Sequence, residues 1–361
     1  MADYHRNDTS GSQRLPTGAN MTFASIQADL AALRAAAPAG VVDPAVLNIG
    51  KSEAGRDMHA IRIGKNPAMP VLIAGCHHAR EWISVEMPIM FADFLVNNYS
   101  TDDRIKRIVD ARDIWIVPLV NPDGHEHSVT VDRLWRKNFP GVAGRDSVDP
   151  NRNYDTTTWA SPTGAFSDDP TNDSYRGPSG AFAKEVVNMQ TLITSKRFKG
   201  SLDYHSFGRF VLFPFCGRTG PHPDPNQDTM ADHVDHVVDS HGVPYLKLQA
   251  SHLYRQPPWS RAPDDALVPG GLMDFVVENV PDSIAITVEL EPEQSDPRGF
   301  VLPPSEIQPT FDRHLGSMLA FLNCVGTLAT PATVRAMALA AGTSNNFSVF
   351  SSPCFSPFET F

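Results

Sequence analysis

The chain has 361 residues and a formal net charge of −11, and 41% of its residues are hydrophobic against 20% charged. This composition supplies enough apolar side chains for a buried core and excludes a coiled coil, a disulfide miniprotein and a disordered tail. The acidic balance argues against nucleic acid or an anionic membrane as a partner, but it does not exclude a local basic pocket. By length alone, two domains or one large α/β domain with extensions are expected.

The cysteines and the first residues bear on the cellular compartment. Four cysteines, at positions 76, 216, 324 and 354, form no CxxC pair, so we expect reduced side chains without a disulfide framework or a structural zinc site. The start MADYHRNDTSGSQRLPTG has no apolar core of a signal peptide, and no stretch reaches the roughly 18 apolar residues of a membrane span. We therefore expect a cytoplasmic protein with no membrane partner, and secretion stays open if a leader precedes this sequence.

Apolar periodicity predicts alternating helices and strands in the first third of the chain. Residues 1–21 are polar and are expected to form a flexible arm, followed by an amphipathic helix over 23–37. A strand pair around the turn EAGRD is predicted within 46–63. The continuous apolar run 70–75 is typical of a strand buried on both faces, and 83–99 has helical spacing.

The alternation continues beyond a long irregular segment. The strand 113–120 ends in the turn signal NPDG, and the stretch from there to about residue 179 is expected to carry site residues, since long loops in compact domains are usually functional. The elements expected after it are a helix at 182–196, strands at 199–206 and 209–215, a helix at 228–242, a helix at 270–280, a strand at 283–290 and a helix at 306–326. This pattern predicts an α/β fold, a three-layer α/β/α sandwich with a central mixed, mainly parallel sheet.

Ligand sites in such sheets lie at the carboxyl ends of strands, and candidate metal ligands occur there. His78 and Glu81 follow the strand 70–75, and His205 stands where the strand 199–206 runs out. A catalytic zinc takes three His or Glu ligands and leaves one position for water. Each residue alone is weak evidence, because the chain has 13 histidines and lone strand histidines are usually core or edge residues. Asp149 is a candidate carboxylate partner for a ligating histidine, and Glu289 is a candidate base at the end of a buried strand.

The residues around these positions resemble those of the zinc carboxypeptidases related to pancreatic carboxypeptidase A. GCHHAREW resembles the motif G-x-H-x-R-E-W, which implies that His78 and Glu81 bind the metal and that Arg80 binds substrate. DYHSFGRFVLFPF resembles the strand pair H-S-[YF], which implies that His205 is the third ligand and that Ser206 contacts substrate. The resemblance implies one zinc ion per chain.

Further motifs in family order extend the resemblance to the substrate site. NPDG is one of them, and DRLWRKN resembles R-x-W-R-K, which implies that Arg136 polarises the scissile carbonyl and that Arg133 serves an outer subsite. VDPNRNYD resembles D-x-N-R-N-[WY], which implies that Asn151 and Arg152 bind the terminal carboxylate of the substrate.

The same motif and the last ones complete the expected machinery. VDPNRNYD also places Asp149 behind His78. TVEL and GFVLPPSEI resemble F-x-E-L and G-F-x-L-P, which implies that Glu289 is the general base. The matches run from residue 22 to about 325, so we expect one catalytic domain over 22–325, the arm 1–21 and a C-terminal extension 326–361, in place of two domains.

The resemblance implies zinc-dependent hydrolysis of a C-terminal peptide bond, with release of an apolar or aromatic amino acid. The substrate is then a peptide or a small N-acyl amino acid with a free carboxylate. One alternative is an amidase or deacylase on the same scaffold, acting on a specialised metabolite or a cell-wall peptide. A more distant alternative is a catalytically silent binding module. The sequence gives no prediction of oligomeric state.

The chain departs from the family pattern in the expected substrate pocket. Ala266 stands where family members carry a mobile tyrosine, and Tyr254 or Trp259 in the same loop is a candidate replacement. Met273 aligns with the position that sets specificity and favours an apolar pocket. Asp203, on the same strand face as His205, and Asp265 are the alternatives that would recruit a cationic or polar residue.

The remaining histidines near these motifs are expected not to bind the metal. His77 is expected to point away from His78 along the strand. His125 and His127 follow NPDG, where solvated side chains are common.

Overall fold

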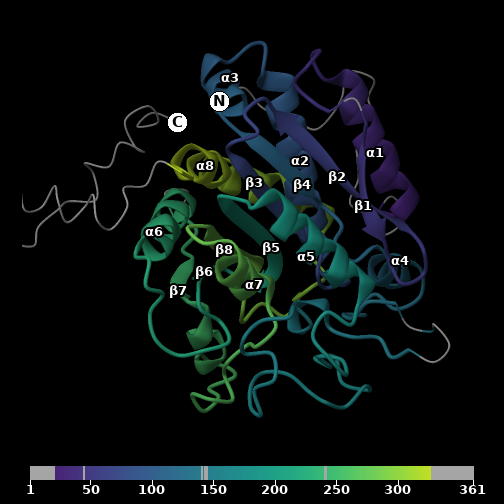
Figure 1. Ribbon diagram of the computed structural model, residues 1–361, viewed down its shortest axis with the longest axis vertical. Helices are drawn as coiled ribbons and strands as arrows, with labels where there is room; N and C mark the ends of the chain where they lie inside the picture. The colour runs from purple at the N-terminus through teal and green to yellow at the C-terminus, as the bar shows by residue number, and fades with distance from the viewer. Residues whose placement is uncertain (1–20, 44, 140, 142–144, 240–241, 327–361) are drawn as a thin grey trace, which may run out of the picture.

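Figure 1 shows the computed structural model, which describes residues 21–43, 45–139, 141, 145–239 and 242–326. The predicted arm and extension lie outside these residues except for Met21 and Gly326, and Cys354 lies outside them as well. Met21 is buried, and its carbonyl oxygen lies 2.8 Å from Nε2 of His125. The packed part of the chain therefore already includes Met21.

The described residues form one eight-stranded sheet, ordered β1-β2-β4-β3-β5-β8-β6-β7. Its central strands β4, β3, β5 and β8 run parallel, and antiparallel pairs join β1 to β2, β2 to β4, and β6 to β8. The strands are β1 (Leu47–Lys51), β2 (Asp57–Gly64), β3 (Pro70–Gly75), β4 (Asp113–Val117), β5 (Gly200–Gly208), β6 (Phe210–Phe213), β7 (Leu246–Gln249) and β8 (Ile284–Glu293).

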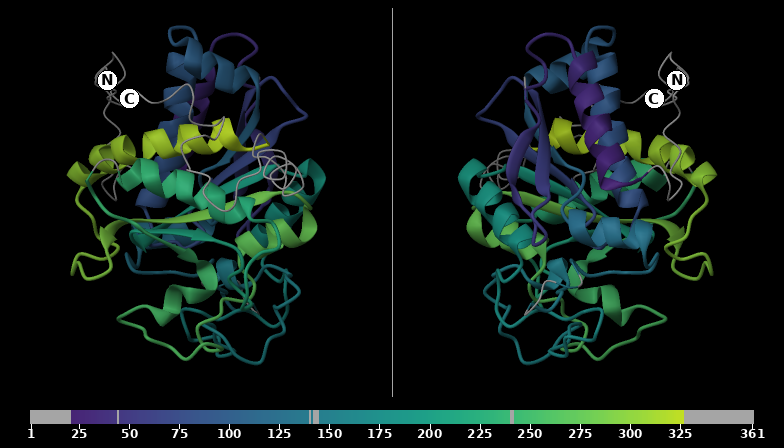
Figure 2. Two further views of the ribbon diagram at one scale, coloured as in Figure 1. Left: turned by 90° about the vertical axis from the view of Figure 1, so that its left-hand side faces the viewer. Right: turned by 90° about the vertical axis from the view of Figure 1, so that its right-hand side faces the viewer.

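Helices cover both faces of this sheet, as the two side views of Figure 2 show. One face packs against α1 (Phe23–Ala36), α2 (Ile83–Asn98), α3 (Asp103–Asp110), α6 (Asn226–Asp239) and α8 (Ile307–Cys324). The other packs against α5 (Lys184–Lys196) and α7 (Leu272–Asn279), while α4 (Pro122–Thr130) follows β4 and contacts α1. The predicted three-layer α/β/α sandwich with a mixed sheet is confirmed.

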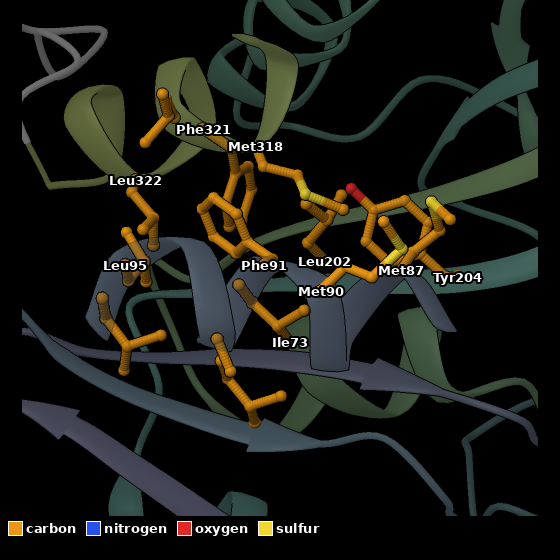
Figure 3. Close-up of a cluster of buried hydrophobic side chains, with 14 of the residues drawn as sticks. Ile73, Met87, Met90, Phe91, Leu95, Leu202, Tyr204, Met318, Phe321 and Leu322 are labelled. Atoms are coloured by element: carbon orange, nitrogen blue, oxygen red, sulfur yellow. The ribbon is translucent and has the colours of Figure 1, made fainter. Parts of the chain in front are cut away.

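Strand alternation separates the two cores. Val71 and Ile73 of β3 point to the face that carries α2 and α8, and Leu72 and Ala74 point to the opposite face. Figure 3 shows the first core, where side chains of α2 and α8 such as Phe91 meet over the strands. The position of a residue along its strand therefore determines which face of the sheet its side chain lies on, and this holds for polar site residues as well.

Local sequence explains where several helices begin, and it corrects one prediction. NPDG is not a free turn, because Asn121 caps α4 by accepting a hydrogen bond from the backbone N–H of Gly124, and Pro122 opens the first turn. A Cβ on Gly124 would lie 2.2 Å from the carbonyl oxygen of Lys137, which explains the glycine.

Three of the helices and strands were not predicted from the sequence. They are α4, the helix α3, which is capped by Asp102, and the short strand β7. None of the described helices combines the length and the apolar character that crossing a membrane requires.

Long connections gather at one end of the sandwich, where the parallel strands end. In Figure 1 the teal and green segments from the second and third quarters of the chain lie at the bottom, and the same grouping appears in both views of Figure 2. The predicted irregular segment is confirmed only beyond α4, whose residues Pro122–Thr130 were expected to belong to it. Between α4 and α5 the described residues form one short 3₁₀ helix, Pro150–Arg152, and an isolated β-bridge between Ser167 and Tyr175. This is the end of the sheet at which the candidate site lies.

Candidate active site

Strand parity and register bring the candidate base beside the candidate ligand of β5. Leu202 and Tyr204 of β5 enter the core under α2 and α8, so Asp203 and His205 face the opposite side. His205 pairs in register with Glu289 of the parallel strand β8. Glu289 was predicted at a strand end, but β8 continues to Glu293, so its carboxyl group is held by a continuous strand.

His78 and Glu81 reach the same place from the neighbouring strand. Both lie in the turn that joins β3 to α2, and β3 runs parallel to β5, so the two strands end at the same edge of the sheet. Nδ1 of His78 lies 2.7 Å from one carboxylate oxygen of Glu81, and Nδ1 of His205 lies 2.9 Å from the other. The two Nδ1 atoms are 3.1 Å apart.

This convergence fits a zinc ion. Two imidazole nitrogens and a carboxylate are a donor set that zinc takes at catalytic sites, and all three side chains, His78, Glu81 and His205, are buried. The outer ring nitrogen of each histidine also meets a carboxylate, since Nε2 of His78 lies 3.2 Å from Asp149 and Nε2 of His205 lies 3.0 Å from Asp203. Such contacts orient ligating histidines.

Charges around the cluster favour ionised ligands. Burial opposes ionisation of Glu81, but His78 and His205 outweigh it and bring the pKa of this carboxyl well below its usual value. Burial also opposes ionisation of Asp149, yet Arg136 and His78 hold its pKa well below the usual range. Two nitrogens of Arg136 lie 2.8 and 3.0 Å from Asp149 Oδ2.

The candidate base has the opposite shift. Burial raises the pKa of Glu289 to about 8, although the positive charges at His205 and Arg136 lower it. A cation bound next to it would lower this pKa further, so that the carboxylate form is present near neutral pH. A carboxyl group whose pKa lies near the working pH is suited to take up and return a proton.

One cavity of about 440 Å³ opens onto this cluster. Nine of the predicted site residues line it: His78, Arg80, Glu81, Arg136, Asn151, Arg152, Ser206, Met273 and Glu289. Three others do not appear in its described lining: His205 and Asp149 lie behind it, and Arg133 borders a separate small cavity of about 20 Å³. Arg133 donates to the carbonyl oxygens of Arg80 and Phe300, so it braces the wall of the site.

Arg152 is held so that part of its guanidinium still faces the cavity. Nε donates to the carbonyl oxygen of Ala165 at 2.8 Å, Nη1 to that of Asn151 at 2.9 Å, and Nη2 to the hydroxyl of Tyr254 at 3.1 Å. A guanidinium has five N–H groups, so these contacts leave one on each of the two Nη atoms. The Asn151 side chain is fixed because its Oδ1 accepts from the backbone N–H of Leu272.

The loop that lacks the family tyrosine supplies another one. Ala266 is fully buried, whereas Tyr254, from the 3₁₀ helix Ala250–Arg255, lines the cavity and contacts Arg152. Trp259 packs edge-on against Tyr254, with ring centroids 4.9 Å apart. Of the two candidate replacements, Tyr254 is the one that touches the arginine.

One prediction about the other histidines is wrong. His125 is not solvated, since its side chain is fully buried and its Nε2 lies 2.8 Å from the carbonyl oxygen of Met21. The ring of His77 stacks on that of His205, with centroids 5.4 Å apart, and its Nδ1 lies 3.2 Å from Asp203, while its expected absence from the metal ligands stays a prediction. Parity along β3 does not extend into the irregular turn after Gly75, so the sequence could not place His77.

The structure places both acidic alternatives for the pocket away from the cavity wall. Neither Asp203 nor Asp265 belongs to the described lining of the cavity. Asp203 is buried against His205 and His77, and Asp265 is exposed.

The family model described as zinc carboxypeptidase matches residues 29–316 of the chain. The chain belongs to the zinc carboxypeptidase family. This zinc carboxypeptidase homologue is 31% identical over 292 residues to metallocarboxypeptidase A of Trichophyton rubrum, in an alignment that covers 77% of this chain and 65% of the fungal one. It is 30% identical over 287 residues to zinc carboxypeptidase A 1 of Anopheles gambiae, covering 77% and 62% of the two chains. The chain thus spans about two-thirds of the length of these relatives or slightly less.

Solved structures of carboxypeptidases share the fold of this family member. The bovine thrombin-activatable fibrinolysis inhibitor, in complex with tick carboxypeptidase inhibitor, superposes with a TM-score of 0.73 at 21% identity, over 86% of this chain and 98% of the other. Carboxypeptidase A from Helicoverpa armigera gives a TM-score of 0.72 at 22% identity, over 85% and 74% of the two chains. At these identities the likeness concerns the fold.

Proposed function

We propose that this chain is a zinc-dependent carboxypeptidase that removes the C-terminal residue from a peptide or a small N-acylated amino acid. The observation that carries the proposal is the convergence of His78, Glu81 and His205 next to a cavity whose lining includes two of them, His78 and Glu81, together with Glu289 and Arg152. The first three residues would hold one zinc ion per chain. A cytoplasmic location stays a prediction from the sequence.

The chemistry divides between the metal and the protein. A zinc ion held by these ligands supplies Lewis acidity, which makes a water molecule more acidic and a peptide carbonyl more electrophilic. The Glu289 carboxylate takes the proton from the attacking water and returns it to the leaving amine. The guanidinium of Arg136, which lines the same cavity, donates to the oxyanion that develops on the carbonyl oxygen.

Exopeptidase specificity comes from the free N–H groups of Arg152. One donor on each Nη atom forms the fork that grips a carboxylate in a bidentate manner, which a lysine cannot reproduce. The Tyr254 hydroxyl contacts this guanidinium, and Asn151 lines the same cavity. Tyr254 therefore supplies the tyrosine hydroxyl at the carboxylate-binding arginine, which Ala266 cannot supply.

An amidase without a carboxylate requirement is the second candidate. It is favoured by the three hydrogen bonds that Arg152 already makes within the protein and by the buried Ala266. The two unused donors of the guanidinium favour the carboxypeptidase.

The terminal side chain of the substrate is expected to be apolar or aromatic. Phe210, Leu212, Leu253, Val268 and Met273 line the cavity together. Among the described lining residues, Glu81 and Glu289 of the reaction centre are the only carboxylates, and four arginines face the same space, so a C-terminal lysine would meet repulsion.

A series of peptides that differ only in the last residue tests this proposal. With zinc-loaded protein, substrates ending in Phe or Leu are expected to exceed those ending in Lys by about 10- to 100-fold in kcat/KM, the free energy of burying a large apolar side chain. Met273→Asp is expected to reduce this ratio. Removal of zinc with a chelator is expected to stop hydrolysis and re-addition to restore it. Equal rates along the series, or full activity without metal, would contradict the proposal.

A further inference from the structure

Behind the candidate ligand His205 lies a buried row of polar groups, Tyr154, His77 and Asp203, to which the motifs of the active site assign no role. The hydroxyl of Tyr154 lies 2.8 Å from Nε2 of His77, Nδ1 of His77 lies 3.2 Å from Oδ1 of Asp203, and Oδ2 of Asp203 lies 3.0 Å from Nε2 of His205. All four side chains are at most 2% exposed. The row connects the loop after Asn153 to strand β5.

The chemistry of these groups sets the direction of each contact. The ionised carboxylate of Asp203 can only accept, so the ring proton of His77 is assigned to Nδ1, which faces Asp203, and Nε2 of His77 then accepts from the hydroxyl of Tyr154. That proton faces Asp203 Oδ1, within ion-pair distance but off the ideal line for a hydrogen bond, and neither atom has another hydrogen-bond partner among the described residues. Oδ2 of Asp203 is then the acceptor for the Nε2–H of His205.

One contact opposes this arrangement. The side-chain nitrogen of Asn151 also lies 3.2 Å from Nε2 of His205, and it is a donor because Oδ1 of Asn151 already accepts from the N–H of Leu272. The carboxylate of Asp203 is closer and charged, and a charge-assisted hydrogen bond is about twice as strong as a neutral one. The N–H group at Nε2 of His205 therefore donates a hydrogen bond to Asp203, and the lone pair on Nδ1 of His205 faces Glu81 and His78.

We propose that Asp203, supported by His77 and Tyr154, is a positioning residue that fixes the tautomer and ring orientation of His205 for metal binding. This proposal rests on the proposed function, which supplies the metal ion. It gives Asp203 the same role behind His205 that Asp149 has behind His78. The two carboxylates differ in their charged partners, because the guanidinium of Arg136 forms an ion pair with Asp149 and neutralises its charge. Within the described residues, the ion-pair partners of Asp203 are His77 and His205 alone.

Charge balance supports this assignment. A buried carboxylate without a cationic partner is costly. A divalent cation at His78, Glu81 and His205 would offset the charges of Glu81 and Asp203 together. Asp203 also lies outside the described cavity lining, so it does not set side-chain preference.

The alternative is a second metal ion. His77, Asp203 and His205 also form a group whose ligand atoms lie within 4.8 Å of one another. Binding there would need the proton of His205 Nε2 to be lost. The second group also has no member in the described cavity lining, whereas His78 and Glu81 of the first group line the cavity, so one metal per chain is expected.

The test compares Asp203→Asn with wild type and with the control Asp265→Asn, which changes an exposed acid outside the row. Transfer of zinc to a competing chelator is expected to show an affinity about 10- to 100-fold lower for Asp203→Asn and unchanged for Asp265→Asn. The visible spectrum of the cobalt-substituted protein is expected to change with Asp203→Asn only. The zinc-free variant is expected to melt no lower than zinc-free wild type, because a buried charge has been removed.

Tyr154→Phe provides a second variant if Asp203→Asn does not fold. It keeps the ring and removes the donor to His77, so it is expected to weaken zinc binding in the same direction and by less. Unchanged zinc affinity in a folded Asp203→Asn, or two zinc ions per wild-type chain, would overturn the proposal. These readouts do not depend on a substrate, so failure of the carboxypeptidase assignment appears separately, as zinc-loaded wild type that leaves peptides intact.

Discussion

Glu289→Gln is expected to lower kcat by about 100- to 10,000-fold, the range in which general acid–base groups contribute, with zinc content unchanged. The amide has nearly the shape of the carboxyl group but cannot take a proton from water. Glu289 is held in register beside His205, inside the cavity, and burial raises its pKa to about 8. Its position and its proton affinity both suit the transfer.

Turnover of a peptide by metal-loaded protein measures this effect. Glu293→Gln is the matched control, because it makes the same change on the same strand at an exposed position, and it is expected to behave as wild type. If Glu289→Gln with zinc bound kept near-normal turnover, the proton would be moved by another group.

Arg136→Lys is expected to lower kcat by about 100- to 1,000-fold, as loss of an oxyanion donor does, with a small change in KM. The guanidinium uses Nε and Nη2 on Asp149, and its Nη1 lies 3.8 Å from Glu81 at the edge of the cavity. A lysine keeps the charge but cannot satisfy Asp149 and an oxyanion together, because it lacks the planar fork.

Steady-state kinetics and zinc content separate catalysis from metal binding in this variant. Arg145→Lys serves as the control, since Arg145 lies in the same segment and pairs with Glu53, away from the described cavity lining. A fall in zinc content equal to the fall in kcat would assign Arg136 to supporting Asp149 instead of the transition state.

The sequence predicts the frame of the site because parity and parallel strand ends are local properties. The candidate ligands were expected at the carboxyl ends of their strands, and β3 and β5 do end at one edge of the sheet. Alternation placed Asp203 on the face of His205, whereas the pairing of His205 with Glu289 is known only from the structure. The irregular segment was expected to be functional, and it holds Arg136, Asp149 and Arg152 as the motifs implied.

The partners that this frame brings together could not be predicted in the same way. Asp203 lies on the same strand face as His205, which the sequence predicts. The turn after β3 places the ring of His77 against His205 and Asp203, and the conformation of this turn depends on tertiary packing. Tyr254 meets Arg152 across about 100 positions of sequence, through a loop without periodicity. The NPDG segment resembled a turn because capping residues and turn residues are the same types.

The most direct test of the central claim compares one peptide with its C-terminally amidated twin, using zinc-loaded protein and mass spectrometry of the products. The account predicts release of single C-terminal amino acids from the free acid, and at most slow turnover of the amide, because the Arg152 fork then has no carboxylate to bind. Equal turnover of the two peptides, or cleavage at internal bonds, would contradict it.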